Sequence, residues 1–235
     1  MINFLKPGPF QKIMVTKKMS FNSNPNVGLY GYATDNYVLV GYEVPEKELK
    51  ELERIFGVPV HRISIAGTSL LGVFLVGTNE LLLVPPITFD YELEKLKKLG
   101  INYKVFETDL TCLGNNIVLT EHGILVNPEF DNAGMKKLKS LFNLPIKKLS
   151  VFETDALGAV MITRSGYCLL HRDASSQEIK IIEETLKVKV TTGTVNMGSP
   201  YIRTGMLCNK NGLIVGDISG GPEIVNAEEA LGFLD

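Results

Sequence analysis

Short apolar runs recur along the chain at nearly even spacing. Each run is a triplet such as Val38-Leu39-Val40, and a marker residue, usually glycine, stands eleven positions before its middle residue. The markers are Gly28, Gly72, Gly114, Gly158 and Arg203, so the successive steps are 44, 42, 44 and 45 residues. A fixed period of this length is typical of repeated supersecondary units. The pattern therefore predicts five repeats.

Each repeat has the same order of local patterns. An apolar strand, such as 73–76 or 159–162, precedes a polar turn, and the apolar triplet forms the second strand. Apolar residues then recur at helical spacing, as at Leu49, Leu52 and Phe56. Third strands are predicted at 58–65, 101–107, 144–151 and 188–195. Each unit is thus a ββαβ repeat.

Turn and helix-cap residues give further predictions about where the elements begin and end. Asn211-Gly212 lies between two apolar runs and predicts a hairpin in which both residues adopt positive φ. Asp90 and Ser175 are predicted N-caps. Gly57 and Gly100 are predicted helix ends.

The fifth repeat ends after its helix and lacks a third strand. Residues 14–21 precede Gly28 by the distance at which the other third strands precede their markers, so the N-terminus is predicted to supply the missing strand and close a ring. We therefore expect one α/β domain over 14–235 with pseudo-fivefold symmetry. Residues 1–13 lie outside it as a candidate disordered extension. The repeats span about 22–66, 67–110, 111–155, 156–198 and 199–235.

The amino-acid composition excludes several classes of protein. Apolar residues make up 45% of the 235, which excludes a disordered chain, and 24 basic against 26 acidic residues exclude a polycation. The three cysteines stand far apart, which argues against a disulfide framework and favours a reducing cytoplasm. Since neither a membrane span nor a signal peptide is apparent, we expect a cytoplasmic protein.

The joining loops form one candidate binding face. These are the segments that lead from each third strand to the next first strand, so they meet at one end of a closed ring, and they are small, polar and mostly uncharged. Such residues also suit plain tight turns, which is the simpler interpretation of any single loop. The loops are 22–26, 66–69, 109–112, 154–156 and 196–200.

A second candidate surface is basic. Residues 132–152 hold five lysines and no acid, and Lys136, Lys137 and Lys139 form a candidate RNA-facing patch on the third helix. A solvated helix face is the favoured interpretation, because no aromatic residues alternate with the lysines.

Catalytic motifs are missing from the sequence. There is no phosphate-binding loop, dinucleotide fingerprint, nucleophile elbow or zinc-ligand spacing. Cys208 could act as a nucleophile only with a base in reach, and a buried apolar role is the default for a lone cysteine. We therefore expect a monomeric binding module without a cofactor, a metal or a catalytic residue.

Several strings resemble the archaeal and eukaryotic translation initiation factor 6 family of ribosome anti-association factors. The similarity extends from about residue 19 to the C-terminus, with Cys112 where the family usually has alanine. An archaeal source is expected, because the chain lacks the serine-containing tail of eukaryotic relatives. The strings are Ser20-Phe21, Ser64-Ile65-Ala66-Gly67, Leu83-Val84-Pro85, Cys112-Leu113-Gly114-Asn115, Leu125-Val126-Asn127-Pro128 and 193–199.

This resemblance implies a fold and a function. The fold would be the pentein, a five-bladed α/β propeller. The function would be docking on the intersubunit face of the large ribosomal subunit, mainly on a ribosomal protein near the sarcin–ricin loop. Docking would block the small subunit until a GTPase and a maturation cofactor release the factor. The implied contact residues are Gly114 and Asn115, with Ala66, Gly67, Thr194, Asn196 and Gly198 on the same loop face.

An alternative comes from another class of protein. Pentein rings also house guanidine-modifying enzymes, and Cys208 lies in the last repeat, where their nucleophile is usually found. The acidic pair of those enzymes is not evident here. A direct RNA binder that uses the lysines of the third repeat is a third hypothesis.

Overall fold

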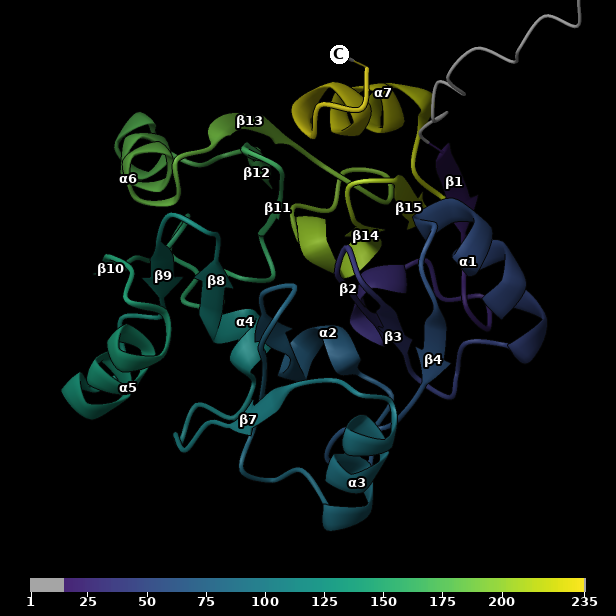
Figure 1. Cartoon of the computed structure of the whole chain (residues 1–235). Coiled ribbons are helices and arrows are strands. Elements are labelled where there is room, and N and C mark those ends of the chain that lie inside the picture. The colour runs from purple at the N-terminus through teal and green to yellow at the C-terminus, as the bar shows by residue number, and fades with distance from the viewer. Residues whose placement is uncertain (1–14, 235) are drawn as a thin grey trace, which may run out of the picture.

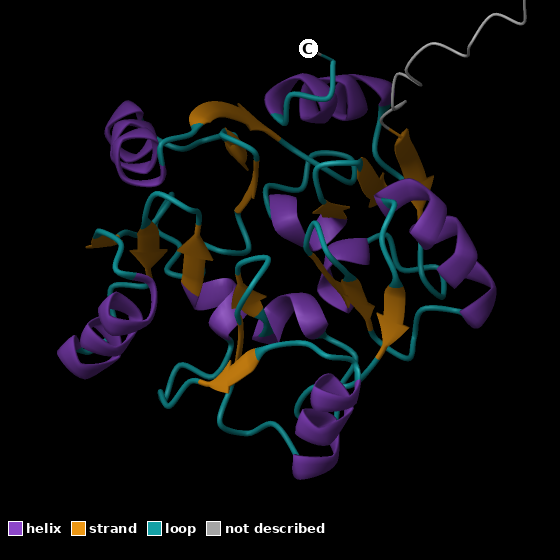
Figure 2. Cartoon of the chain, in the orientation of Figure 1, coloured by secondary structure: helices purple, strands orange, loops and turns teal. Residues whose placement is uncertain are grey.

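Five three-stranded sheets surround a central axis in this computed structural model, which describes residues 15–234 (Figure 1). The long helices lie on the outside of the ring, and short helical turns gather around its centre (Figure 2). In every sheet the middle strand is antiparallel to the first strand and parallel to the third. The predicted ββαβ repeat, and with it the five-bladed pentein architecture, is confirmed.

The first strands are β2 (Gly31–Ala33), β5 (Val76–Gly77), β8 (Ile117–Leu119), β11 (Met161–Arg164) and β14 (Met206–Cys208). The middle strands are β3 (Val38–Val40), β6 (Leu82–Val84), β9 (Ile124–Val126), β12 (Tyr167–His171) and β15 (Gly212–Gly216). The third strands are β4 (Val60–Arg62), β7 (Tyr103–Val105), β10 (Ile146–Lys148), β13 (Lys189–Gly193) and β1 (Val15–Met19).

The outer helices are α1 (Leu49–Phe56), with the preceding 3-10 turn η2 (Glu46–Glu48), α3 (Asp90–Lys98), α5 (Asn132–Phe142), α6 (Ser176–Leu186) and α7 (Gly221–Ala230). The inner helical turns are η1 (Val27–Tyr30), α2 (Leu71–Phe74), α4 (Leu113–Asn116) and η3 (Ile202–Gly205).

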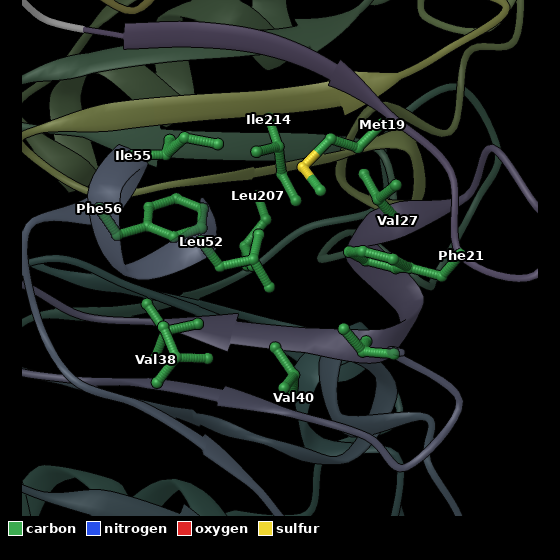
Figure 3. Packing of buried hydrophobic residues seen from close by; sticks show 12 residues of the cluster. Met19, Phe21, Val27, Val38, Val40, Leu52, Ile55, Phe56, Leu207 and Ile214 are labelled. Atoms are coloured by element: carbon green, nitrogen blue, oxygen red, sulfur yellow. The ribbon is translucent and has the colours of Figure 1, made fainter. Parts of the chain in front are cut away.

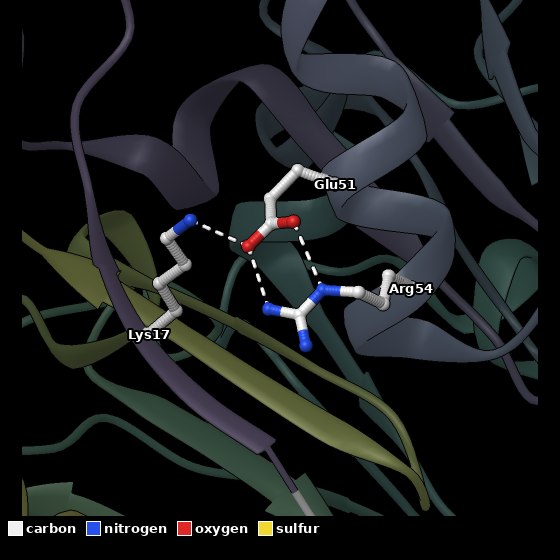
Figure 4. A network of polar contacts seen from close by, with 3 residues as sticks. All are labelled: Lys17, Glu51 and Arg54. Carbon is white, nitrogen blue, oxygen red and sulfur yellow. Dashed lines mark hydrogen bonds and ion pairs between the residues drawn. The ribbon is translucent and has the colours of Figure 1, made fainter.

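The N-terminal strand closes the ring, as predicted. β1 pairs in parallel with β15, from Val15 opposite Gly212 to Met19 opposite Gly216. Lys17 and Arg54 both donate to the carboxylate of Glu51, which ties β1 to α1 (Figure 4). Of the predicted strand 14–21, Met14 lies outside the described residues, as does the predicted extension 1–13.

Both faces of each middle strand are packed against apolar side chains, which explains why the triplets are continuous rather than alternating. Val38 and Val40 face a cluster with Leu52 of α1 and Ile214 of β15 (Figure 3). Leu39 joins a separate cluster with the second repeat. Full burial of one such side chain contributes about 1.5–3 kcal/mol. Five clusters of this kind each join two neighbouring blades.

Some predicted elements have different bounds. The predicted strand 73–76 is largely the helical turn α2, and its strand begins only at Val76. The predicted strand 159–162 likewise becomes β11 only from Met161. Each third strand is shorter than predicted. The first strands begin later because the chain forms a helical turn next to the axis before it enters them. The third strands end earlier because the chain turns into the joining loop, as at the bridge between Ile65 and Thr68.

The predicted hairpin at Asn211-Gly212 is wrong in its geometry, because neither residue has positive φ. Instead, the Asn209 side chain accepts hydrogen bonds from both backbone N–H groups and closes the turn. Positive φ at both turn positions occurs in the fourth repeat, at Ser165 and Gly166.

Most of the predicted helix ends are confirmed. Ser175 caps α6, and Gly57 ends α1 in the left-handed conformation. Gly100 follows α3 with φ of 72°, and its N–H donates to the carbonyl oxygen of Lys97. Asp90, predicted as an N-cap, is instead the first residue of α3, because the preceding N–H of Phe89 is held by Glu92.

Candidate interaction face

The joining loops lie at one end of the ring, because all third strands run parallel to the middle strands and end on the same side. We call this end the loop face. In four of the loops the residues at the tip have positive φ. They are Asn22 and Ser23, Ala66 and Gly67, Phe152 and Glu153, and Asn196, Met197 and Gly198. The structure thus brings most of the predicted loop residues to the tips of tight turns.

Glutamates in the first turn of three outer helices hold these loop tips. The carboxylate of Glu92, only 2% exposed, accepts from the N–H groups of Ala66 and Gly67 at 2.8 and 3.0 Å. Glu223 accepts in the same way from Met197 and Gly198 at 3.0 and 2.8 Å. Each glutamate also accepts from the N–H at the start of its own helix, so the loop and the helix are locked together.

Hydrogen bonds to the carboxylates shift the pKa values of two of these glutamates. Burial alone would raise the pKa of Glu223, but the Thr194 hydroxyl and backbone N–H groups that donate to it hold the pKa below its ordinary value. In the fourth repeat, donation from Ser175 and from the backbone of Phe152 likewise outweighs burial and lowers the pKa of Glu178. The sequence signal that could identify these residues is a glutamate at the third helical position.

Two predicted contact residues also hold the loops together. The hydroxyl of Thr194 donates to Glu223 at 2.7 Å. The side chain of Asn196 donates to the carbonyl oxygen of Pro25 at 3.1 Å, which joins the loop between the fourth and fifth repeats to the loop before the first. Both residues are half-buried, and their polar side-chain groups are engaged in hydrogen bonds within the protein.

The marker glycines form the inner wall of the ring. A Cβ on Gly72 would lie 2.0 Å from the carbonyl oxygen of Gly28, and one on Gly114 would lie 2.2 Å from that of Gly72. A Cβ on Gly158 would likewise clash with the carbonyl oxygen of Gly114, and a Cβ on Gly28 would clash with that of Arg203. Only glycine permits this approach of one backbone to the next, which explains the repeated marker.

The structure separates the predicted pair Gly114 and Asn115. Gly114 is buried in the inner wall, where it contacts backbone on both sides. Asn115 is half-buried, and within residues 15–234 its side-chain amide makes no hydrogen bond, while its carbonyl oxygen accepts from the N–H of Gly158. Asn115 is therefore the member of the pair with side-chain hydrogen-bonding groups left for a partner.

Large apolar side chains are exposed around the loop face. Eight of the ten that the described residues expose lie on or beside the joining loops, on the segments that lead from a middle strand into an outer helix, or in the first turn of that helix. We call these eight the apolar rim. Met197, at a loop tip, is 79% exposed. Sequence reasoning missed the rim because its members are far apart in the chain. They are Tyr42, Ile87, Phe89, Tyr91, Phe152, Met197, Tyr201 and Ile218.

The third repeat departs from this pattern. Gly134 occupies the position in α5 where the other helices carry glutamate, and among residues 15–234 no carboxylate accepts a hydrogen bond from the 109–112 loop. Lys137 instead donates to the carbonyl oxygen of Glu107 at 3.0 Å. The loop face is consequently charged rather than apolar at this repeat, with Glu107 and Asp109 exposed.

Some of the predicted basic patch is used within the fold. Lys137 donates to the carbonyl oxygen of Glu107, as described above, and Lys139 donates to the carbonyl oxygen of Leu144 at 3.0 Å. Lys136 is exposed and has no hydrogen bond or ion pair within the described part of the chain. Of the three patch residues, Lys136 is thus the one whose ammonium group points to no local partner.

Cys208 lies in a central cavity rather than on the surface. It is buried, and burial raises the pKa of its thiol to about 12. Such a thiol is protonated near neutral pH, whereas a nucleophilic cysteine needs a lowered pKa. Over residues 15–234 no group of His, Cys, Asp or Glu side chains is arranged to hold a metal ion. In the same range no helix has the length and apolar character that crossing a membrane requires.

Two solved structures with a related fold are enzymes. A dimethylarginine dimethylaminohydrolase has a TM-score of 0.53 and 15% identity, over 71% of this chain and 67% of that one. The N-terminal domain of ArgZ, a cyanobacterial arginine dihydrolase, has a TM-score of 0.52 and 13% identity, over 78% of this chain and 71% of that domain. Likeness at this level of identity shows the pentein fold alone.

Sequence comparisons point to a different group of proteins. Translation initiation factor 6 of Thermococcus onnurineus is 34% identical over 228 residues, covering 94% of this chain and 100% of that protein. The factor from Saccharolobus islandicus is 30% identical over 222 residues, covering 93% and 100%. The model of the eIF-6 family matches residues 16–230. The chain therefore belongs to the eIF-6 family.

Proposed function

We propose that the loop face docks on the intersubunit face of the large ribosomal subunit and blocks premature joining with the small subunit. Family membership supports a role in translation, since the relatives carry the name translation initiation factor 6. A ribosomal function would place the protein in the cytoplasm. The protein would act by occupying a surface rather than by catalysis.

The apolar rim is the observation that carries the choice of face. Exposed large apolar side chains that gather at one end of a molecule are typical of an interaction site. Met197, Phe152 and Tyr201 stand on loops that a rigid ring holds in place. A preorganised loop face loses little conformational entropy on binding, which favours stable docking.

The apolar character of the face and the net charge of the chain indicate what kind of partner the face binds. Apolar and aromatic side chains suit a protein surface, where such residues dominate the buried centre of interfaces. A net charge of −2 is unsuited to broad contact with phosphate backbones. These features favour a protein partner, and the family resemblance implies that this partner is a ribosomal protein near the sarcin–ricin loop, with Lys136 as the candidate for a minor ribosomal RNA contact.

Sedimentation with separated ribosomal subunits tests this proposal. The wild-type chain should co-sediment with large subunits and not with small ones. A variant with Met197→Asp should lose most of this binding, whereas Val225→Asp, which places the same charge on an exposed position of α7 outside the rim, should keep it. Equal binding of both variants would assign docking to another face.

A further inference from the structure

Arg203 places a half-buried cation near the axis of the ring, away from the apolar rim. Its backbone takes the marker position of the fifth repeat, where the other repeats have glycine. Its guanidinium donates to the carbonyl oxygens of Gly114 and Leu75, which belong to the inner turns of the third and second repeats. The side chain therefore lies across the centre of the ring.

A central cavity of about 190 Å³ lies beside this guanidinium. Its walls are first-strand residues from all five blades, including Val76, Ile117 and Met161. Among the described residues that line it, Arg203 is the only one with a charged side chain, and Tyr32 and Thr163 add hydroxyl groups.

The cavity leads toward the end of the ring opposite the loop face. Tyr32, Ala33 and Thr163 line both the cavity and a wider depression among the hairpin turns. Asp35, Glu121, Arg164 and Lys187 lie around this depression, so acidic and basic groups are balanced there.

The hydrogen bonds of Arg203 leave its charge unneutralised. A guanidinium has five N–H donors, and here two carbonyl oxygens accept from it, while no carboxylate does so within residues 15–234. Burial lowers the pKa of Arg203, which expresses the cost of a desolvated cation. Buried charges are ordinarily paired, and the planar fork of arginine matches carboxylate and phosphate oxygens.

We infer that the central cavity binds a small oxyanion, a phosphate or a carboxylate, which pairs with Arg203 and reaches it from the hairpin end. The hydroxyls of Tyr32 and Thr163 are the neutral donors available to the same anion. The apolar walls and the volume restrict the site to small ligands. Because the entrance is opposite the loop face, this site is separate from the proposed ribosome contact.

Nuclear magnetic resonance of the full chain tests this inference without ribosomes. Inorganic phosphate and, in a second series, acetate are titrated at constant ionic strength, with sodium chloride as the balancing salt. The expected result is a saturable shift of the Arg203 Nε–Hε signal and of the Ile117 amide in at least one series. The series that saturates at the lower concentration identifies the ligand class.

Two variants separate the cavity from general salt effects. Arg203→Gln should abolish the saturable shift of Ile117. If that variant does not fold, Ala33→Leu keeps the cation and fills the cavity, and it should weaken binding at least tenfold. The inference is overturned if shifts in both series grow linearly without saturation, if they fall only on surface residues, or if folded Ala33→Leu binds as the wild type does.

Discussion

The guanidinium of Arg203 donates a hydrogen bond to the carbonyl oxygen of Gly114, so the marker residue of the fifth repeat is bonded to that of the third. The other markers are in contact through backbone alone, glycine against carbonyl. The centre of the ring is therefore held by close backbone packing and by one long side chain. This arrangement makes the inner wall rigid and places the joining loops at fixed positions.

Gly72→Ala should destabilise the ring strongly. The added Cβ would lie 2.0 Å from the carbonyl oxygen of Gly28, and that backbone cannot move without disturbing the neighbouring marker. We expect a loss of at least about 2–3 kcal/mol in the free energy of unfolding, measured by urea denaturation. Gly221→Ala is the matched control, because a Cβ there meets nothing within 4 Å. Similar midpoints for the two variants would contradict the packing argument.

The glutamates that hold the loops should make stability depend on pH. The pKa of Glu223 is lowered in the folded protein from its ordinary value of 4.5, so the unfolded chain binds the proton more readily. The stabilisation is present above that value and is lost as pH falls through the lower, folded pKa. Glu223→Gln should therefore flatten the loss of stability below about pH 4.5. Urea midpoints between pH 7 and 3 measure this, and an unchanged slope would contradict it.

Asn115→Arg should weaken docking on large subunits while the fold is retained. The side chain of Asn115 is half-buried and unpaired within the described chain, so a cation there would enter a desolvated contact without a partner. We expect at least about a tenfold loss of affinity, measured by co-sedimentation. The circular dichroism spectrum and urea midpoint should match those of the wild type. Undiminished binding by a folded variant would remove Asn115 from the interface.

Cys208→Ala should leave docking unchanged and cost about 1 kcal/mol of stability, as a small buried side chain is shortened. This variant tests the enzyme alternative, which needs a cysteine nucleophile in the ring. Wild-type protein should release no product from arginine or methylated arginines, and the variant should behave identically. Turnover by the wild type that the substitution abolishes would support the guanidine-modifying alternative.

The architecture could be predicted from the repeat period, because the period reflects how the backbones and strands of the ring must pack. The marker glycine recurs since each backbone must approach the next, and the apolar triplets recur since the middle strands are buried on both faces. Ring closure by 14–21 followed from counting strands, and the pairing of β1 with β15 confirms it. The short inner turns were missed because apolar runs such as 73–76 suit a strand equally well.

The interaction face was harder to predict. Loop positions such as Ala66 and Asn196 could be placed at one end, because the strand order fixes that end. The apolar rim could not, since Tyr42, Phe152 and Met197 come from different repeats and only folding brings them to one end. The side chain of Arg203 was also missed, because nothing in its sequence neighbourhood says that it lies across the axis.

Subunit joining measures the central claim most directly. Purified chain is mixed with separated large and small ribosomal subunits at a magnesium concentration that permits joining, and the mixture is resolved on a density gradient. We expect the wild type to migrate with the large subunit and to remove the peak of joined particles, and Met197→Asp to restore that peak. Normal joining in the presence of excess wild-type protein would contradict the account.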